Sequence, residues 1–547
     1  MPRFNLADHF LDRHLREGRG DKIAIRCEGR SVTYAQIAEQ ANRVGNGLRA
    51  IGVGKSERVV LLLPDIPEFA ACYFGAIKIG AVAVPTNTSL RASDYGYLLD
   101  ESEAAALMVH SSIYPQLDPA LSRYPRRVVV VAEKGDRLLC PETQIVEAVW
   151  SGGGGQSGLS PFSGSSIVCG GREWDAWLAA QSPHLDPEPT EDTDAAFWLW
   201  TSGTTGTPKG AVHLQRDWVS SCENYARGVL AIHADDVTFS SSKLFHAYGL
   251  GNGLMFPFYV GASSVLFPGR PQAAAILATA QAARPTLFFS VPTLYAAMLQ
   301  EPDSYDLSSV RVAASAAEPL PAGIFRQWKE RFGVEILDGI GSTEALHIYL
   351  SARAGKVRPG STGQPVAGYD IRVVDFEGRD VSPGTIGDLL VRGESVARCY
   401  WNRRELSAQR MRGGWFHSGD KYSVDGDGYF WYAGRGDDML RVSGQWVSPV
   451  EVEGALAEHG AVLEAAVVSH READGLYTVK AFVVLKAGRP QAPGLVEELQ
   501  AFVKQRITPY KYPRLIEFIA ELPKSSTGKL LRYKLRESEP PRVVNSR

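Results

Sequence analysis

Short apolar runs alternate with longer segments of helical periodicity along most of this chain. Residues 59–63 and 128–131 are rich in Val and Leu, the composition of strands that are buried on both faces. Between such runs lie stretches such as 68–80, whose apolar residues recur at helical spacing. This alternation predicts an α/β fold in which helices cover a largely parallel sheet.

The pattern changes after residue 370. Residues 371–381, 387–393 and 429–435 form short strand-like segments that are separated by Gly and Asp turns. Such segments are typical of antiparallel sheets with tight connections. We therefore expect a small, barrel-like β subdomain over about 365–434.

The last part of the chain has the pattern of a separate small domain. Helical patterns at 449–459 and 496–507 accompany strand-like residues at 465–468 and 479–484. This block of roughly one hundred residues has the size of a small α+β domain. We expect a large N-terminal domain over 1–436, built of stacked, mostly parallel sheets with helices and including the β subdomain, and a C-terminal domain over 437–536. Two stretches are expected to be disordered, the Gly/Ser-rich residues 152–166 and the tail 537–547.

Composition fits a large enzyme and excludes several other classes of protein. The chain has 547 residues, of which 44% are hydrophobic, and a net charge of −3. This length implies more than one domain. The chain has no block of basic residues, which argues against nucleic acid as a partner. The six cysteines include no C-x-x-C pair, so neither a zinc site nor a disulfide framework is indicated.

The beginning of the chain carries charges throughout and lacks the apolar core of a signal peptide. No run of about 18 apolar residues, the length that a membrane-spanning helix needs, occurs anywhere in the sequence. We therefore expect a cytoplasmic protein without a membrane span.

The segment TSGTTGTPKGAVH, residues 201–213, has the composition of a phosphate-binding loop. Glycines let backbone N–H groups approach an anion, hydroxyls donate further hydrogen bonds, and Lys209 adds a positive charge. The segment is not the loop G-x-x-x-x-G-K-[ST] of P-loop NTPases, because Gly203 and Gly206 stand three apart and Gly210 follows Lys209. By composition alone, a Gly/Thr-rich surface turn is the alternative. The candidate phosphate ligands are Thr201, Ser202, Gly203, Thr204, Thr205, Gly206 and Lys209.

In its order of residues, this loop resembles the phosphate loop of the acyl-adenylate-forming ligases. Four further segments resemble other motifs of that superfamily: IGSTE (340–344), WFHSGD (415–420), GRGDDMLRVSG (434–444) and PKSSTGKLLR (523–532). All five stand in the family's order, and together they are far more specific than any one alone. In addition, segments 243–257 and 338–351 resemble the benzoate-CoA ligase branch, a group of aryl-CoA ligases.

The resemblance implies an ATP-dependent enzyme that joins a benzoate-type aromatic acid to CoA. Benzoate, an aminobenzoate such as anthranilate, and a hydroxybenzoate are the expected acids. A carboxylic acid is a carboxylate at neutral pH and a poor electrophile, so its oxygen must become part of a leaving group. In the implied reaction the carboxylate attacks the α-phosphorus of ATP and pyrophosphate leaves. The CoA thiolate then attacks the acyl-AMP and releases AMP.

The resemblance also assigns the main catalytic and nucleotide-binding residues. Lys529 matches the lysine that neutralises charge around the α-phosphate. Glu344 matches the glutamate that binds Mg²⁺, and Thr343 belongs to the same motif. Asp420 matches the aspartate whose two oxygens accept the ribose hydroxyls, with Arg435 beside it. The other expected ATP and AMP contacts are Ala317, Glu318, Pro319, Asp338, Gly339, Ile340, Gly341, Ser342 and Tyr432.

For the acyl group, the resemblance and the residue types indicate a short, flat pocket. Aromatic side chains with glycines between them suit one ring and exclude a long chain. The expected pocket residues are Tyr225, Ala247, Tyr248, Gly249, Gly341, Leu346 and His347, although for Tyr225 ordinary aromatic core is the alternative. The polar tips of Tyr248 and His347 offer partners for an amino or hydroxyl substituent. His246 stands where the family screens the acyl carboxylate, a position that holds Phe in benzoate-CoA ligases and His in halobenzoate ligases.

The family rotates its C-terminal domain about a hinge between the two half-reactions, so the resemblance implies that this domain is mobile here. Asp437 matches the hinge residue. Ser443 and Gly444 are expected to line the tunnel through which the pantetheine arm of CoA enters.

Two alternatives stay open on the sequence alone. The acid could be cyclohexanecarboxylate or another small-ring acid, or the enzyme could load a carrier protein in place of CoA. A binding protein that has lost catalysis is disfavoured, because Lys209, Glu344, Asp420, Arg435 and Lys529 are all present. We expect a monomer or a homodimer.

Overall fold

The structure is a computed structural model, and the residues that it describes are 3–117, 127–131, 167–168, 171–202, 207–436, 438–442, 445–471, 477–486, 488–489, 491–524 and 530–537. Two stretches were expected to be disordered. Of these, residues 152–166 and 538–547 lie outside the described residues, and Glu537 ends helix α16 (Arg532–Glu537).

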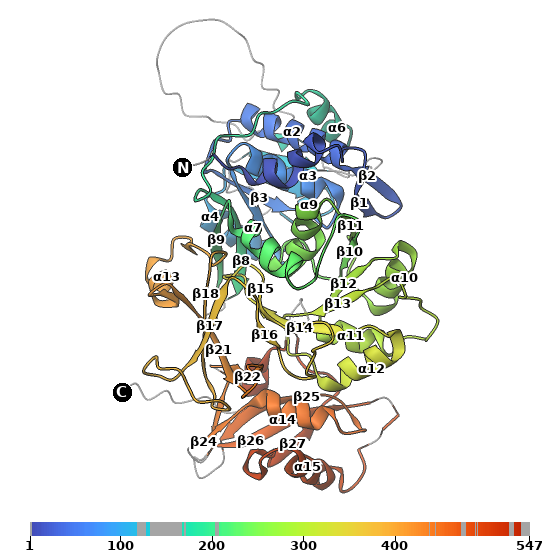
Figure 1. The fold of residues 1–547 in the computed structure, drawn as a ribbon, viewed down its shortest axis with the longest axis vertical. Coiled ribbons are helices and arrows are strands. Elements are labelled where there is room, and N and C mark those ends of the chain that lie inside the picture. Colours follow the sequence, from blue (N-terminus) through green and yellow to red (C-terminus); the bar gives the residue numbers. More distant parts are fainter. Residues whose placement is uncertain are drawn as a thin grey trace, which may run out of the picture.

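Two large sheets form the body of the molecule, and Figure 1 shows them in its upper and middle parts. The first has the strand order β19 (Cys399–Tyr400), β9 (Pro208–Leu214), β8 (Ala195–Ser202), β4 (Val82–Pro85), β3 (Arg58–Leu62), β5 (Ala106–His110), β6 (Arg127–Val131) and β7 (Ile167–Val168). The second has the order β16 (Gln364–Pro365), β15 (Ile348–Ser351), β14 (Ile336–Gly341), β13 (Val312–Ser315), β12 (Leu287–Ser290), β10 (Val237–Ser240), β11 (Ser263–Leu266), β1 (Ile23–Cys27) and β2 (Arg30–Thr33).

Most neighbouring strands in both sheets are parallel, which confirms the predicted α/β fold. The antiparallel exceptions include β8 with β9 and β14 with β15. These two pairs carry the segments in which the sequence places the phosphate loop and Glu344.

Three smaller sheets follow, one in the range 365–434 and two, β23–β24 and β25–β26–β27, among the C-terminal elements. In the range 365–434 the chain forms an antiparallel sheet of β17 (Tyr369–Val374), β18 (Gly387–Gly393), β21 (Trp415–Val424) and β20 (Met411–Arg412), with β22 (Phe430–Arg435) paired to β21. The C-terminal elements lie at the end of the molecule opposite α2 and α3 (Figure 1). Their strands are β23 (Leu440–Val442), β24 (Gln445–Val447), β25 (Val462–Arg471), β26 (Tyr477–Leu485) and β27 (Leu515–Phe518). The exact limits of the domains stay a prediction.

Helices cover the sheets. The α-helices besides α16 are α1 (Arg13–Arg16), α2 (Tyr34–Ala50), α3 (Pro67–Lys78), α4 (Ala92–Ser102), α6 (Gly171–Ala179), α7 (Asp217–Ser221), α8 (Ala247–Leu250), α9 (Phe256–Val260), α10 (Ala273–Ala283), α11 (Pro292–Met298), α12 (Ala322–Phe332), α13 (Arg404–Arg410), α14 (Pro449–Ala457) and α15 (Leu495–Arg506). Three π-helical segments, η1 (Asp8–Asp12), η3 (Cys222–Arg227) and η4 (Gly251–Met255), and two short 3₁₀ turns, η2 (Tyr114–Gln116) and η5 (Pro509–Lys511), complete the described elements.

Helices α2 and α3 show how local sequence sets this packing. Thr33 and Gln36 form a reciprocal capping box that starts α2. Gly75 lets the two helices approach closely, because a Cβ atom there would lie 2.7 Å from the carbonyl oxygen of Ala41. Pro67 starts α3 in its first turn, where a missing N–H costs nothing.

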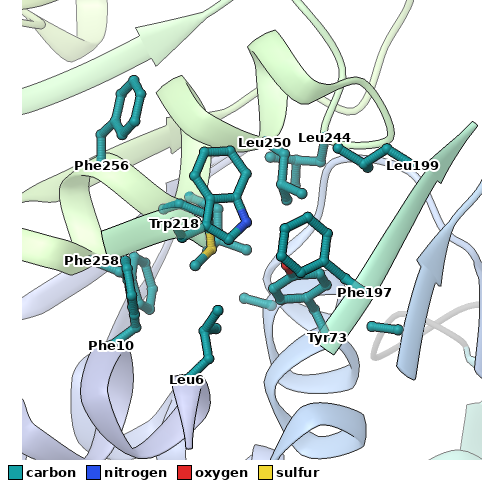
Figure 2. Packing of buried hydrophobic residues seen from close by; sticks show 14 of the residues in the cluster. Leu6, Phe10, Tyr73, Phe197, Leu199, Trp218, Leu244, Leu250, Phe256 and Phe258 are labelled. Carbon is teal, nitrogen blue, oxygen red and sulfur yellow. The ribbon is translucent and has the colours of Figure 1, made fainter. Parts of the chain in front are cut away.

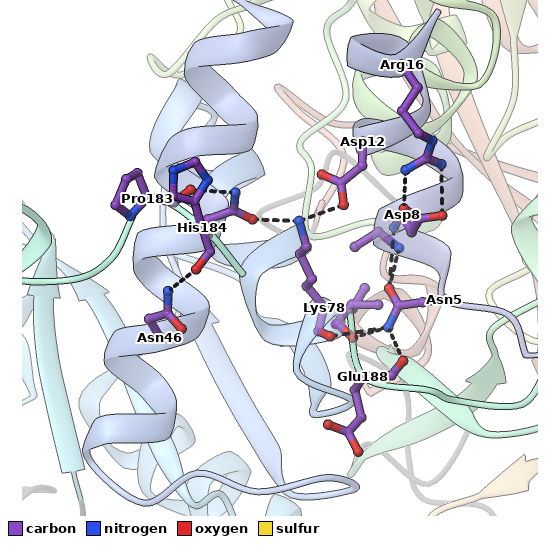
Figure 3. A network of polar contacts seen from close by, with 12 residues as sticks. Asn5, Asp8, Asp12, Arg16, Asn46, Lys78, Pro183, His184 and Glu188 are labelled. Atoms are coloured by element: carbon purple, nitrogen blue, oxygen red, sulfur yellow. Dashed lines mark hydrogen bonds and ion pairs between the residues drawn. The ribbon is translucent and has the colours of Figure 1, made fainter. Parts of the chain in front are cut away.

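The N-terminal segment is fastened to α3 by a polar network that Figure 3 shows. The Lys78 ammonium is buried, lies 2.6 Å from the Asp12 carboxylate and donates to the Asn42 side chain at 2.6 Å. The Asn5 amide donates to the carbonyl oxygens of Lys78 and Glu188. A buried ammonium with two such partners is satisfied, so we assign this network to the stability of the fold.

The largest hydrophobic core lies between the two sheets. Figure 2 shows Trp218 on α7 surrounded by side chains from β8, α3 and the α8–α9 region. The Phe197 ring stacks on Trp218 at 5.8 Å and on His213 at 5.1 Å between ring centroids. The core thus reaches β9, the strand that follows the phosphate loop.

Among the described residues, no helix has both the length and the apolar character that a membrane span requires.

Candidate active site

The predicted phosphate loop joins the antiparallel strands β8 and β9. Thr201 pairs with Lys209, and Ser202 pairs with Pro208. Gly203, Thr204, Thr205 and Gly206 lie outside the described residues. Lys209 is half-buried at the start of β9, and burial lowers the pKa of its ammonium while Glu344 opposes that shift. The cation that the sequence predicts is therefore next to the predicted metal ligand.

Glu344 lies in the turn between β14 and β15. Its carboxylate oxygen Oε1 accepts a hydrogen bond of 2.6 Å from the Tyr400 hydroxyl, and its backbone carbonyl accepts one of 2.7 Å from the Ala397 N–H. The Lys209 Nζ atom lies 5.4 Å from the centroid of the Tyr400 ring. Burial and the Glu344 carboxylate raise the pKa of the Tyr400 phenol, so it remains a donor at neutral pH.

A buried histidine joins this turn to the strand of the phosphate loop. His213 on β9 is fully buried, and its Nε2 lies 2.8 Å from the carbonyl oxygen of Thr343. Its Nδ1 lies 3.0 Å from the Asp217 carboxylate, which also accepts the Leu214 N–H at 2.9 Å. Because a carbonyl oxygen can only accept, Nε2 carries a proton and donates to Thr343. His213 therefore fixes the backbone next to Glu344.

The predicted ribose ligands face each other across β21 and β22. Asp420 pairs with Arg435 in the register of the two strands, and their side chains form an ion pair of 3.3 Å. The Asp420 N–H donates to the Ser418 hydroxyl at 3.0 Å, and Asp420 is 7% exposed. Tyr432 stands nearby on β22 with its pKa raised by burial and by Asp420. The ion pair with Arg435 therefore orients the Asp420 carboxylate, and the Ser418 hydrogen bond holds its backbone.

The predicted adenine contacts come from β14 and from the segment after β13. Asp338 is buried on β14, and burial raises the pKa of its carboxyl well above the ordinary value. Its oxygen Oδ1 has no hydrogen-bond partner among the described residues. Ala317 has φ +76°, a left-handed conformation that non-glycine residues rarely adopt. Strained backbone of this kind is concentrated at functional sites. Glu318 and Pro319 follow it, and Gly339, Ile340, Gly341 and Ser342 lead from β14 into the Glu344 turn.

The predicted acyl-pocket residues gather around the ring of His347. Its centroid lies 5.3 Å from Tyr225, 5.5 Å from Tyr248 and 4.5 Å from Phe256. His347 is 2% exposed, and neither ring nitrogen has a partner in hydrogen-bonding geometry among the described residues. Burial lowers the pKa of His347 to about 3, against an opposing effect of the Tyr248 backbone. The imidazole is therefore neutral at pH 7, with one donor and one acceptor.

Other members of the predicted pocket are held by tight backbone approaches. A Cβ atom on Gly341 would lie 2.4 Å from the His347 carbonyl oxygen, and one on Gly249 would lie 2.1 Å from the Lys243 carbonyl oxygen. Leu346 is buried with φ +71°. The Tyr248 hydroxyl donates to the Ala314 carbonyl oxygen at 3.1 Å, so its donor is already used and only its acceptor remains for a substituent.

His246 precedes α8, whose first residue is Ala247. Its ring lies 4.5 Å from that of Phe245, and burial lowers its pKa to about 4. A neutral imidazole at this position is consistent with a residue that screens rather than carries charge.

Several predicted site residues belong to segments that the structure does not describe. Lys529, the hinge residue Asp437 and the tunnel residues Ser443 and Gly444 lie outside the described residues, as does the centre of the phosphate loop. Their roles remain predictions.

The structure adds residues that the motifs did not indicate. Tyr400, His213 and Asp217 hold the Glu344 turn, and Phe256 and Gly251 contact His347. Three of these residues fall within segments that the sequence analysis identified: His213 is the last residue of the phosphate segment, and Gly251 and Phe256 lie in segment 243–257. Nothing in the sequence pairs His213 with Thr343, or Gly251 and Phe256 with His347.

The profile of the AMP-binding enzyme family matches residues 11–401, and that of the AMP-binding enzyme C-terminal domain matches residues 451–529. A benzoate–CoA ligase of Thauera aromatica is 44% identical over 540 residues, which is 98% of this chain and 96% of that protein.

Two solved structures are similar over nearly their full length. The anthranilate CoA ligase AuaEII in complex with anthranoyl-AMP has a TM-score of 0.88 and 39% identity, and the match covers 98% of both chains. A benzoate CoA ligase from Burkholderia xenovorans LB400 has a TM-score of 0.85 and 41% identity, with 97% of this chain and 100% of that chain covered. These findings confirm the resemblance that the motifs indicated, and this chain belongs to the AMP-binding enzyme family.

Proposed function

We propose that this protein is an ATP-dependent aryl-CoA ligase. It activates a benzoate-type acid as acyl-AMP with release of pyrophosphate, and then transfers the acyl group to CoA with release of AMP. The similarity to benzoate–CoA ligases and to an anthranilate CoA ligase that holds anthranoyl-AMP supports both steps. The observation in this chain that carries the proposal is the ring cluster around His347, which joins directly onto the Glu344 turn.

In the first step the acid supplies its own nucleophile, so no general base is required. The chain's task is to hold ATP and to neutralise charge. Lys209 and the hydroxyls of the phosphate loop bind the β- and γ-phosphates. Asp420, whose carboxylate is paired with Arg435, accepts the ribose hydroxyls. Lys529 neutralises the charge that develops between the carboxylate and the α-phosphate.

Magnesium is the metal that the family implies, and the donor set fits it. Among the described residues, no group of three or more His, Cys, Asp or Glu side chains could hold a metal ion by itself. Glu344 offers one hard carboxylate, which suits an ion that takes its other ligands from phosphates and water. When bound, Mg²⁺ neutralises phosphate charge and orients the pyrophosphate leaving group.

The acid is a single ring with a carboxylate. His347 lies between two tyrosines and Phe256, in a space where added methylenes would overpack the rings. Because its imidazole is neutral, His347 can donate to a hydroxyl or accept from an amino group on the ring. We therefore favour hydroxybenzoate or aminobenzoate over unsubstituted benzoate. A ring acid such as cyclohexanecarboxylate, and a carrier protein in place of CoA, are the alternatives.

A panel of acids tests this proposal. Pyrophosphate and AMP release would be measured with and without CoA for benzoate, 2-aminobenzoate, 4-hydroxybenzoate, cyclohexanecarboxylate and decanoate. We expect an aromatic acid to exceed decanoate in kcat/KM by about tenfold to a hundredfold, the range that one closed apolar pocket supplies. Efficient turnover of decanoate would exclude the aryl assignment. Acyl-AMP formation without any thioester on addition of CoA would favour the carrier-protein alternative.

A further inference from the structure

Tyr400 contacts both of the charged groups that the proposed function needs. Its hydroxyl donates to Glu344 Oε1 at 2.6 Å, and the Lys209 Nζ atom lies 5.4 Å from the centroid of its ring. No ion pair joins Lys209 to Glu344 within 4.0 Å in the part of the chain that the structure describes. One side chain thus bonds the carboxylate and occupies the space beside the cation.

Strand pairing, backbone hydrogen bonds and burial fix the position of Tyr400. Strand β19 pairs with β9 so that Tyr400 lies opposite Ala211, two residues beyond Lys209. The Tyr400 N–H donates to the Ser407 hydroxyl at 2.9 Å, and the next residue, Trp401, donates to the Gly210 carbonyl oxygen at 2.8 Å. Tyr400 is 4% exposed. A ring held by backbone pairing and burial cannot easily turn away from Glu344.

This arrangement leaves Glu344 one oxygen for a metal. Oε1 is taken by the Tyr400 hydroxyl, whereas Oε2 has no hydrogen-bond partner among the described residues. A hydrogen bond to a carboxylate is strong and directional, so it fixes the plane of the carboxylate as well as its position. Partners of this kind typically set metal affinity by holding the ligand in one orientation.

The ring has a second effect, on Lys209. If the space of the ring were vacant, the flexible Lys209 side chain could reach Glu344 and pair with it. Such a pair would neutralise the cation that phosphate requires and the anion that the metal requires. The aromatic face attracts the ammonium weakly and keeps it apart from the carboxylate.

We propose that Tyr400 is a positioning residue that presents Glu344 to the magnesium of bound MgATP and keeps Lys209 separate from Glu344. The proposal rests on the proposed function for the identity of the nucleotide and the metal. It requires no particular acid.

Two substitutions separate the hydroxyl from the ring. Tyr400→Phe removes only the hydrogen bond, and Tyr400→Ala removes the ring as well. Tyr34→Phe is the control. Tyr34 is a buried residue of α2, away from this site, and its hydroxyl donates to the carbonyl oxygens of Ala262 at 2.6 Å and Pro257 at 3.4 Å, so this variant also loses buried hydroxyl hydrogen bonds. Thermal unfolding of all variants would show whether each is folded.

The readout is binding, measured with α,β-methylene-ATP, an analogue that cannot be cleaved at the α-phosphorus. Mn²⁺ binding to the enzyme–analogue complex would be followed by electron paramagnetic resonance, and analogue binding without metal by calorimetry. We expect Tyr400→Phe to weaken Mn²⁺ binding by about tenfold or more and to leave metal-free analogue binding within twofold of wild type. Tyr400→Ala should weaken both. Tyr34→Phe should change neither.

Unchanged Mn²⁺ affinity in Tyr400→Phe would overturn the positioning role. Metal-free analogue binding of wild-type strength in Tyr400→Ala would overturn the spacer role. Failure of the acid panel would leave these binding results intact, so the two proposals fail separately.

Discussion

At the residue scale, the His347 ring shows how burial turns an ordinary side chain into a neutral polar group. Its folded pKa of about 3 lies below the unfolded value of 6.5. Below pH 6.5 the unfolded chain therefore binds a proton that the folded chain does not, and stability falls as the pH falls from 6.5 toward 3. By pH 5 this group alone should cost the folded state about 2 kcal/mol.

His347→Phe keeps a ring and removes this titration. We expect the difference in unfolding free energy between variant and wild type to move in the variant's favour by about 2 kcal/mol between pH 7.5 and pH 5. Urea unfolding at the two pH values measures it. Because only the change with pH is compared, any packing cost of the Phe ring cancels. If the unfolding free energies of variant and wild type changed equally between the two pH values, the His347 imidazole would not be held neutral in the folded state.

The sequence identified the residues that carry charge but not the residues that hold them. Lys209, Glu344 and Asp420 stand in motifs, and the structure brings Lys209 and Glu344 next to Tyr400. Tyr400 and His213 act on partners 56 and 130 residues away along the chain. Such pairs follow from strand order and register, and no local pattern encodes them.

At the element scale, the short helical segments after β10 shape the ring cluster. Segment η4 begins at Gly251, where a Cβ atom would lie 2.5 Å from the His347 ring atom Cδ2 and 2.7 Å from Nε2. Gly251 thus leaves room for the imidazole.

Gly251→Ala should displace that ring. We expect a loss of about 1–3 kcal/mol of stability from overpacking, together with a lower kcat/KM for single-ring acids. Gly323→Ala is the control, because Gly323 lies in helix α12, where an added Cβ atom would meet no neighbouring group within 4 Å. We expect this variant to keep wild-type stability and wild-type kcat/KM. Thermal unfolding and steady-state rates test this pair. If the two variants had the same stability and the same kcat/KM, the position of the His347 ring would not depend on the space that Gly251 leaves.

Long elements were predictable and short ones were not. Helix α14 begins at Pro449 as the pattern indicated, and α15 spans Leu495–Arg506 against the expected 496–507. By contrast, α8, η3 and η4 have four to six residues each and hold the rings of the predicted pocket. Segments of four to six residues are too short to show a helical repeat of apolar residues in the sequence, and tertiary packing determines their conformation.

At the scale of the whole molecule, helix α16, which follows Lys529 in the chain, is joined to the residues after the predicted hinge. Arg532 and Arg536 on α16 pair with Asp438, and Arg532 also pairs with Glu453 on α14 at 2.7 Å. The chain three residues beyond Lys529 is therefore tied to the chain that begins just after Asp437. We expect any rotation about Asp437 to carry Lys529 with it.

This coupling predicts opposite results for two variants. Lys529→Ala should cut acyl-AMP formation by about a hundredfold or more, the scale of losing one preorganised charge-stabilising group, and should spare thioester formation from supplied acyl-AMP. Asp437→Pro restricts φ at the predicted hinge, so it should keep adenylation and lose most thioester formation. Asp437→Ala, which leaves φ free, should be mild. Each half-reaction is measured separately, by pyrophosphate release and by thioester formation from acyl-AMP.

The predicted tunnel gives an independent check of the same rotation. Gly444→Leu should spare adenylation and block thioester formation by filling space, without touching the hinge. If Asp437→Pro transferred its acyl group at the wild-type rate while Gly444→Leu did not, the predicted tunnel would stand. The hinge would then have to lie nearer Gly434, whose φ of +133° is one that residues other than glycine rarely adopt. If both variants transferred normally, one fixed arrangement would serve both half-reactions, and Lys529 could not be delivered by rotation.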